Sequence, residues 1–358
     1  MKKLLMNTVE RATRYMEEVE SRRVAPAPEA LARLAELKVS LPEHPTEPDH
    51  ILALLDEIGS PATVTTTGGR YFGFVNGGAL PAAVAANWLA AAWDQNAALA
   101  VMSPVAAALE EVALGWVIDL LGLPADCGGA VVTGATMANF TALAAARHAV
   151  LRRAGWDVEA DGLFGAPPIT VVVGAETHIS LLKALALLGL GRSRVVTVPA
   201  DGQGRMRAEA FPKLQGPSIV CVQAGNVNTG AFDPAVEICA LAHEHGAWVH
   251  IDGAFGLWAA VSPSRAHLTR GFADADSWAT DAHKWLNQVL VSFGDAETTR
   301  HVIAGLQTDG TCWCGGTVWQ GQTAMRISVS SWATTEEDVE RSLAAMLRIA
   351  GAVRAGRV

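Results

Sequence analysis

The chain is poor in the residues that mark several classes of protein. Only 2 of its 358 residues are tyrosine, aromatic residues make up 6%, and charged residues make up 18%. No apolar run reaches membrane-spanning length, because Asn87, Asp94 and Gln95 interrupt the richest apolar stretch. The net charge is −9 and no long basic run is present. We therefore expect neither a nucleic-acid surface nor a membrane segment.

Cysteine is also sparse, and its spacing excludes the common cysteine-based sites. The five cysteines are scattered and odd in number, and Cys312 and Cys314 are two positions apart. That spacing fits neither a CxxC redox pair nor a zinc site, so we predict no metal. The N-terminal sequence turns polar at Asn7, too soon for the apolar region of a signal peptide. A reduced, cytoplasmic protein is the expectation.

What the chain has in abundance is apolar residues, 50% of the total, enough for a large buried core. Helices are predicted within residues 1–38, followed by an extended proline-rich linker and a short helix from Ile51 to Ile58. This N-terminal region is too thin for a core of its own. We expect an arm that packs on something else, plausibly a second subunit.

Two polar or aromatic segments precede the main α/β pattern. The loop 68–78 is rich in glycine and contains Phe72, Phe74 and Asn76, which either line a pocket or form a satellite core cluster. Alanine-rich helices are predicted near 81–93 and 104–121. Between them Gln95 and Asn96 follow Asp94, and this polar triplet is either a pocket wall or a turn at a helix end.

From Gly128 onward, short apolar strands alternate with helices. Ala130 to Val132 is predicted to be a strand that enters the helix 137–150 through a turn of small residues. A helix N-terminus after such a turn favours an anion such as phosphate, although a plain strand–helix connection looks similar. The turn residues are Gly134, Ala135 and Thr136.

Three further polar residues follow predicted strands. His178 follows the β-branched strand 169–173, Asn226 follows the strand 219–222, and Asp252 ends the strand 248–252, with Ala254 two positions later. Ligands bind at the carboxyl ends of strands in open α/β sheets. Each residue also has a structural interpretation, such as a satisfied histidine or a helix N-cap. The repeated strand–helix order predicts a doubly wound, mainly parallel sheet.

The segment Thr280-Asp281-Ala282-His283-Lys284-Trp285 places a lysine between a histidine and a tryptophan. Apolar walls around Lys284 would favour the neutral, nucleophilic amine that a Schiff base with a carbonyl cofactor requires. A surface lysine beside an interfacial tryptophan is the alternative interpretation. The upstream residues at strand ends favour the cofactor hypothesis, because each supplies one need of the same ligand.

Taken together, His178, the Asp252-Gly253-Ala254 segment and the segment ending in His283-Lys284-Trp285 resemble the group II pyridoxal-phosphate decarboxylases. This family includes the aromatic amino acid, histidine and glutamate decarboxylases. The resemblance implies an aspartate aminotransferase-like fold and pyridoxal 5'-phosphate as cofactor. It also implies an L-amino acid as substrate, decarboxylation to an amine and carbon dioxide, and a homodimer.

The resemblance also implies a role for each matching residue. Lys284 forms the Schiff base, Asp252 keeps the pyridine nitrogen protonated, and His178 stacks on the cofactor ring. Residues 133–136 and His283 bind the phosphate, and Asn226 lies in a loop that contacts the ring substituents. Arg326 matches an arginine that grips the substrate carboxylate, for which its planar fork is suited, although a structural salt bridge is the rival. The substrate-pocket candidates are Phe72, Phe74, Asn76, Gln95 and Asn96.

The resemblance has one interruption. After Asn287 the chain continues directly into the strand 288–293, and a stretch the size of a small domain is missing by comparison with the family. That stretch usually carries a tyrosine that delivers a proton, and this chain has only Tyr15 and Tyr71. The expected organisation is an arm over 1–60, a cofactor-binding domain over 61–287 and a small C-terminal α+β domain over 288–358. Another pyridoxal-phosphate lyase or aldolase, and a catalytically impaired relative, are the alternatives.

Overall fold

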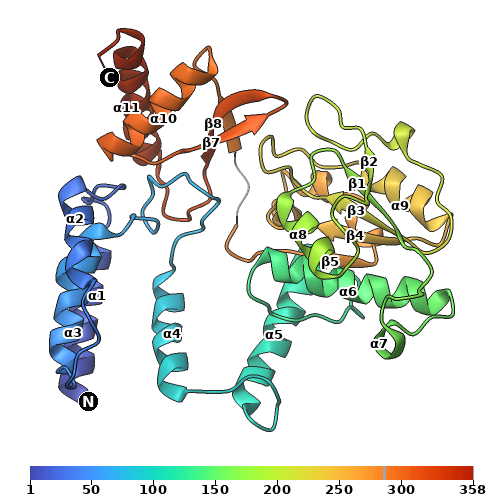
Figure 1. Ribbon diagram of the computed structural model, residues 1–358, viewed down its shortest axis with the longest axis horizontal. Coiled ribbons are helices and arrows are strands. Elements are labelled where there is room, and N and C mark those ends of the chain that lie inside the picture. Colours follow the sequence, from blue (N-terminus) through green and yellow to red (C-terminus); the bar gives the residue numbers. More distant parts are fainter. Residues whose placement is uncertain (285–287, 358) are drawn as a thin grey trace. The chain divides into compact units, whose positions relative to one another are not determined.

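The computed structural model describes residues 1–284 and 288–357. The chain forms two compact units (Figure 1). The first joins Met1–Ala79 to Asn287–Val358, and the second is Leu80–Leu286. This differs from the expected three segments, because residues 61–79 belong with the C-terminal part of the chain. Each unit is described separately below.

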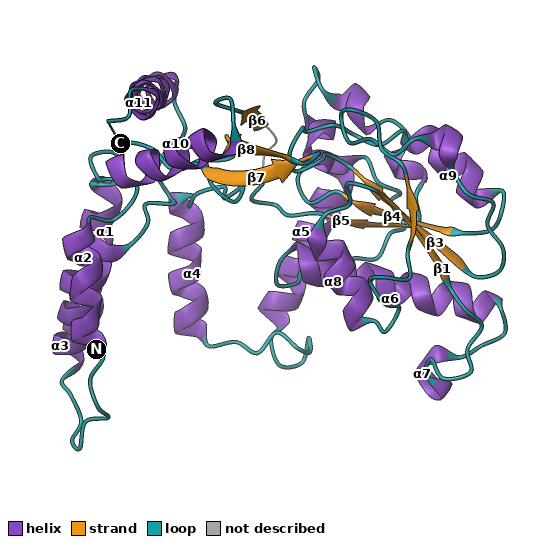
Figure 2. Cartoon of the chain, turned by 45° about the horizontal axis from the view of Figure 1, so that its top comes forward, coloured by secondary structure: helices purple, strands orange, loops and turns teal. Residues whose placement is uncertain are grey.

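The second unit is an α/β structure built on a sheet of five parallel strands in the order β2-β1-β3-β4-β5 (Figures 1 and 2). Its strands are β1 (Thr170–Gly174), β2 (Val196–Val198), β3 (Ser218–Gln223), β4 (Trp248–Asp252) and β5 (Ser277–Ala279). Its helices are α4 (Pro81–Trp93), α5 (Pro104–Leu121), α6 (Ala135–Arg153), α7 (Val158–Asp161), α8 (Ile179–Leu187) and α9 (Ala235–His243).

Side chains alternate between the two faces of this sheet, so that both faces are covered. On β3, Ile219 and Cys221 join the cluster under α6 and α8, whereas Val220 and Val222 join the cluster that includes α9. The two views show α9 on the opposite side of the sheet from α6 and α8. The predicted doubly wound, mainly parallel sheet is confirmed, and its strands are apolar because both faces are buried.

Sequence signals fixed some element boundaries well. Helices α4 and α5 have the expected bounds, and each begins with a proline, which is favoured at the first helical position. The predicted strand 130–132 is wrong. The Val131 side chain is 70% exposed, and its N–H donates to Glu110 Oε1 at 2.9 Å instead of to a neighbouring strand.

The first unit joins the two ends of the chain. Its elements are α1 (Lys2–Glu17), α2 (Pro28–Arg33), α3 (Pro48–Leu54), β6 (Gln288–Val291), α10 (Ala296–Asp309), β7 (Gly315–Trp319), β8 (Gln322–Ser328) and α11 (Glu336–Arg354). The three strands form an antiparallel sheet in the order β6-β8-β7. The predicted late helix and strands are therefore present.

The N-terminal arm packs on the C-terminal part of its own chain, and the expected contact with a second subunit stays a prediction. Val24 N–H donates to the Gly310 carbonyl at 2.8 Å, and Phe72 N–H donates to the Trp313 carbonyl at 2.8 Å. Phe72 lies in the same core cluster as Leu306 and Met325. The contacts of Phe72 bring residues 61–79 into the first unit. Among the described helices, none combines the length and the apolar character needed to cross a bilayer.

Candidate active site

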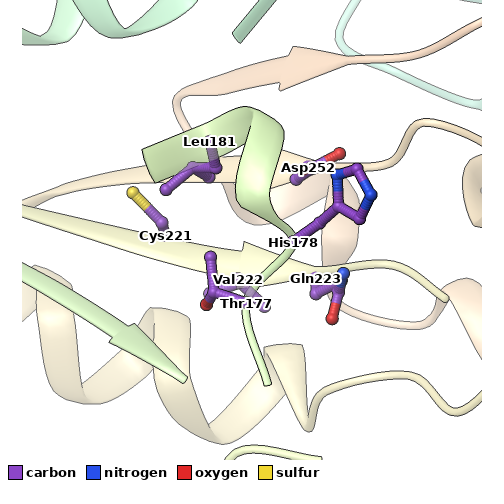
Figure 3. A pocket seen from close by; sticks show the side chains of 7 residues that line it. All are labelled: Thr177, His178, Leu181, Cys221, Val222, Gln223 and Asp252. Carbon is purple, nitrogen blue, oxygen red and sulfur yellow. The ribbon is translucent and has the colours of Figure 1, made fainter. Parts of the chain in front are cut away.

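A small pocket lies at the carboxyl ends of the central strands of the second unit (Figure 3). The register pairs Gln223 at the end of β3 with Asp252 at the end of β4, which places their side chains at the same edge of the sheet. The close-up shows His178 beside Asp252. The pocket is lined by Thr177, His178, Leu181, Cys221, Val222, Gln223 and Asp252.

Asp252 is a buried carboxylate with both oxygens held. Oδ1 accepts the N–H of Ala254 at 3.3 Å, and Oδ2 accepts Nδ2 of Asn139 at 3.2 Å. Burial raises the pKa of Asp252, while nearby His178, these two donors and Lys284 act in the opposite direction. A buried acid so placed is suited to pairing with a cationic ligand atom.

His178 begins helix α8 as its N-cap. Its Nδ1 accepts the Ser180 N–H at 3.3 Å and lies 2.7 Å from Ser180 Oγ. These contacts fix the imidazole plane at the end of β1, where the chain leaves the sheet. The structure thus places His178 and Asp252, predicted from separate strand ends, in one pocket.

Lys284 belongs to the same unit and is half-buried. Its Nζ forms an ion pair with Asp281, whose side chain is only 7% exposed. Asp281 is held in turn, because its N–H donates to the Ala254 carbonyl at 3.0 Å and its own carbonyl accepts Trp258 Nε1 at 2.8 Å. The Lys284 amine therefore has a carboxylate partner, and the expectation of apolar walls around it stays a prediction. Trp285 and Asn287 lie outside the described residues, and the predicted deletion at that point stays a prediction.

The expected anion cradle has the geometry of an open helix terminus. Gly134 is the N-cap of α6 with φ 85° and ψ 167°, a conformation that is essentially restricted to glycine. No side chain of the described residues caps the helix there, so the first-turn N–H groups of Ala135 and Thr136 remain available for a ligand. His283, the other predicted phosphate ligand, has a side chain that is 56% exposed.

Other predicted site residues have structural roles or lie elsewhere. Asn226 is buried, and its Oδ1 accepts the N–H groups of Asn228 and Thr229, so its amide holds its own loop together. Gln95 donates to the Trp93 carbonyl, and Asn96 accepts from Ala98 N–H. Both belong to an exposed turn after α4, which matches the alternative given above.

The aromatic loop and Arg326 belong to the first unit. Phe72 is 2% exposed and sits in the core, which does not support its expected place in a substrate pocket. Phe74 is 68% exposed and packs against Trp313 at 5.5 Å between ring centroids, while Asn76 is half-buried. Burial lowers the pKa of Arg326. Arg326 has no ion-pair partner within the described residues, contrary to the salt-bridge alternative.

Three residues at or behind the pocket were not among the predicted site residues: Gln223, Asn139 and His250. Gln223 lines the pocket directly. Asn139 and His250 lie behind it, where Asn139 bonds to both Asp252 and His250. Asn139 lies one turn of α6 after the residues 134–136, and this spacing was the sequence signal that could have indicated a place near the site. No group of three or more possible metal ligands occurs in the part of the chain that the structure describes.

The open parallel sheet, with an acid, a histidine and a lysine beyond its strand ends, agrees with the expected aspartate aminotransferase-like fold. Comparison with known proteins agrees. Residues 28–294 match the family model described as the pyridoxal-dependent decarboxylase conserved domain. The chain belongs to this family, as its sequence motifs predicted.

Individual relatives differ in substrate. The chain is 30% identical over 267 residues to the acidic amino acid decarboxylase GADL1 of Bos taurus, covering 72% of this chain and 50% of the relative. It is 27% identical over 296 residues to the aromatic-L-amino-acid decarboxylase of Bacillus atrophaeus, covering 80% and 59%. The chain therefore spans about half the length of the curated relatives it matches.

A solved structure supports the fold. The crystal structure of mouse CSAD superposes with a TM-score of 0.87 at 19% identity, covering 98% of each chain. At that identity the likeness concerns the fold alone.

Proposed function

We propose that this protein is a pyridoxal-phosphate-dependent carboxy-lyase that converts an L-amino acid into its amine and carbon dioxide. The proposal rests on three side chains of one compact unit. They are the buried carboxylate of Asp252, the neighbouring imidazole of His178, and the amine of Lys284, whose charge acts on Asp252. Membership of the pyridoxal-dependent decarboxylase family supports the same activity. The relatives act on acidic and aromatic amino acids, so their names do not select one side-chain class.

The residues present fit the cofactor. The N-terminus of α6 suits a phosphate, because its N-cap residue is Gly134, which has no side chain to occupy the first-turn N–H groups. Asp252 is buried, with both carboxylate oxygens held by donors, and it lies beside His178 in the pocket. A buried acid needs a cationic or hydrogen-bonding partner, and the pyridine nitrogen of the cofactor is such a group. Lys284 supplies the amine.

Each residue then has one task. The N–H groups of Ala135 and Thr136 would bind the phosphate, Asp252 would hold a proton at the pyridine nitrogen, and His178 would cover the ring face. Lys284 would attach the cofactor through its Nζ. When bound, pyridoxal phosphate supplies the electron sink that accepts the electrons left by carbon dioxide. Asp281 keeps Lys284 positioned through its ion pair.

The absorption spectrum of the protein with added pyridoxal phosphate tests the cofactor assignment. We expect a visible band in the wild type, and borohydride should fix the cofactor on the peptide that contains Lys284. Lys284→Ala should show neither. Lys213→Ala, which removes an exposed lysine of the same unit, is the matched control and should behave as wild type. A folded wild-type protein without the band would refute cofactor attachment at Lys284.

Carbon dioxide release separates the proposed activity from its alternatives. The loaded protein is offered acidic, aromatic and aliphatic L-amino acids, and products are identified by mass spectrometry. Amine and carbon dioxide in equal amounts support the decarboxylase. Retro-aldol cleavage products identify another lyase on the same scaffold. Cofactor attachment without turnover of any substrate supports an impaired relative.

We also propose that two copies of the chain form a homodimer through α4 and α5. Both helices expose large apolar side chains: Trp88, Trp93 and Trp116 are 43%, 49% and 69% exposed. An exposed apolar surface of this extent marks an interaction site. Light scattering should give the mass of a dimer, and Trp116→Glu should shift it to the monomer. A wild-type monomer at micromolar concentration contradicts the proposal.

We propose a cytoplasmic location, supported by the five free cysteines, four of which are buried. A reducing compartment preserves such thiols. Cell fractionation with an antibody to the chain tests this proposal, and recovery from an oxidising compartment would contradict it.

A further inference from the structure

Behind Asp252 lies a chain of buried polar side chains that the reaction outlined above does not use. Asn139 on α6, His250 on β4 and Ser277 on β5 are 0%, 0% and 9% exposed. Parallel pairing of the strands places His250 opposite Ser277, and α6 packs across both strands. Buried polar groups are costly unless they are hydrogen-bonded, so the partners of each one need to be accounted for.

Every member of this set has a partner. Trp248 Nε1 donates to Ser277 Oγ at 2.8 Å, and Ser277 Oγ lies 3.0 Å from His250 Nδ1. His250 Nε2 lies 2.8 Å from Asn139 Oδ1, and Asn139 Nδ2 donates to Asp252 Oδ2 at 3.2 Å. The side chains thus form one continuous row from a partly exposed indole to the pocket carboxylate.

The chemistry of the two ends fixes the direction of every bond in the row. An indole N–H can only donate, so Ser277 Oγ accepts from Trp248 and has its own proton to give to His250 Nδ1. A carboxylate accepts, so the Asn139 amide nitrogen faces Asp252 and its oxygen faces His250. His250 Nε2 must therefore carry the proton. The row needs one neutral tautomer of His250 and one orientation of Asn139.

Burial favours the neutral imidazole that this row requires. It lowers the pKa of His250 to about 3, and the opposing effect of the Ser277 backbone carbonyl is smaller. Asn139 is the donor at the far end, and its hydrogen bond stabilises the charged form of Asp252. Aligned hydrogen bonds of this kind polarise one another.

We propose that Trp248, Ser277, His250 and Asn139 form a directional hydrogen-bond relay that keeps Asp252 ionised and oriented. This inference rests on the proposed function, since Asp252 is the partner of the pyridine nitrogen there. By donating to Asp252, the relay makes the carboxylate a weaker base, so the shared proton resides on the ring nitrogen. Asn139 and His250 are then positioning residues, not catalytic ones.

The direction of the relay is tested in the wild-type protein without cofactor. Nitrogen-15 NMR of histidine-labelled protein, with the signals assigned through His250→Gln, reports which ring nitrogen carries the proton. We expect Nε2–H, a neutral ring and no titration between about pH 5 and 8. A proton on Nδ1, or a ring that titrates in this range, would overturn the relay. This result does not depend on whether the cofactor binds.

The effect on the pocket is tested with bound pyridoxal phosphate labelled at the ring nitrogen. The wild type should show a protonated nitrogen. Ser277→Ala should move the signal toward the neutral pyridine and lower kcat by about fivefold, the effect of losing one hydrogen bond between neutral groups. Ser277→Thr, which keeps the hydroxyl, should stay within about twofold of wild type.

A second pair of variants guards against misfolding. Trp248→Phe removes the first donor of the relay, and Trp156→Phe removes a single indole donor, to the Gly162 carbonyl at 2.8 Å, elsewhere in the unit. Only Trp248→Phe should change the ring-nitrogen signal. Equal effects of the two, equal effects of the two Ser277 variants, or an unchanged signal in Ser277→Ala would each overturn the proposal. Failure of wild type to bind the cofactor would refute the proposed function and leave the tautomer result standing.

Discussion

Arg70 and Asp338, from opposite ends of the chain, form a buried ion pair in the first unit. Nε of Arg70 lies 3.7 Å from Oδ1 of Asp338, with side chains 3% and 9% exposed. The same guanidinium donates through Nη2 to the carbonyls of Glu20 and Arg22, each at 2.9 Å, and through Nη1 to that of Thr311. One side chain therefore ties the N-terminal arm to the C-terminal part.

Removing this arginine should destabilise the first unit strongly. Arg70→Ala leaves the carboxylate of Asp338 buried without its cation, and breaking one partner of a buried pair costs about 3–5 kcal/mol. Chemical denaturation followed by circular dichroism measures the loss. Arg33→Ala, which breaks an exposed pair with Glu36, should leave the free energy of unfolding unchanged within error. Equal effects of the two variants would contradict the assigned role.

The phosphate site yields a prediction with a control on the same helix. Gly134→Ala puts a Cβ on a backbone with φ 85°, and the strained residue should shift the first-turn N–H groups. We expect about tenfold weaker binding of pyridoxal phosphate, the loss of one hydrogen bond to a charged group. Binding of pyridoxal without its phosphate should stay unchanged. Fluorescence titration measures both affinities.

Gly155→Ala is the control for that experiment. Gly155 follows the C-terminal end of α6 with φ 81°, and a Cβ there meets nothing within 4 Å, as at Gly134. Both substitutions should cost similar stability, of the order of 1 kcal/mol. Only the one at the N-terminus should weaken phosphate binding. Weaker binding of both ligands by Gly134→Ala would point to a general loss of structure instead.

Much of the fold was predictable because its signals are local. Proline at positions 81 and 104 marks the starts of α4 and α5, and buried parallel strands such as β1 are continuous β-branched runs. The strand predicted at 130–132 shows where this fails. Its apolar residues suit a strand, but a strand also needs a neighbouring strand to bond with. The Val131 N–H donates to the Glu110 side chain instead.

The site was predictable only where residues follow strands. Asp252 and His178 were found because strand ends converge at one edge of a parallel sheet. Asn139 and His250 were missed because they are 111 positions apart in the sequence, and their contact is visible only in the folded chain. Phe72 illustrates the converse error, since a glycine- and aromatic-rich loop looks the same whether its rings line a pocket or enter a core, as this ring does.

Acid should destabilise the protein through His250. Its pKa is lowered from 6.5 to about 3 by burial, so between these values the unfolded chain binds a proton that the folded chain does not. The stabilisation is complete above about pH 6.5 and is lost as the pH falls toward 3, by up to about 1.4 kcal/mol per unit. Urea unfolding at a series of pH values measures this slope.

Three variants separate the contribution of His250 from that of an opposing group. Burial raises the pKa of Asp233 to about 6, so this acid contributes stability at low pH that is lost as the pH rises from about 4 to 6. In an Asp233→Asn background the free energy of unfolding should therefore fall more steeply as the pH is lowered, because the opposing contribution of Asp233 is removed. His250→Gln should flatten this pH dependence, whereas His243→Gln, at an exposed histidine, should leave it unchanged. An unchanged slope in His250→Gln contradicts the assignment.

Arg326 yields the last prediction, which concerns the substrate. Its half-buried guanidinium has no carboxylate within ion-pair distance among the described residues, so it is a cation that still lacks an anionic partner. If it binds the substrate carboxylate, Arg326→Lys keeps the charge but loses the two parallel hydrogen bonds of the planar fork. We expect KM for the amino acid to rise about tenfold or more, with the affinity for pyridoxal phosphate unchanged. Arg300→Lys, at an exposed arginine on α10, should leave both constants as in the wild type. A rise in KM for both variants, or a loss of cofactor affinity in Arg326→Lys alone, would assign Arg326 a structural role.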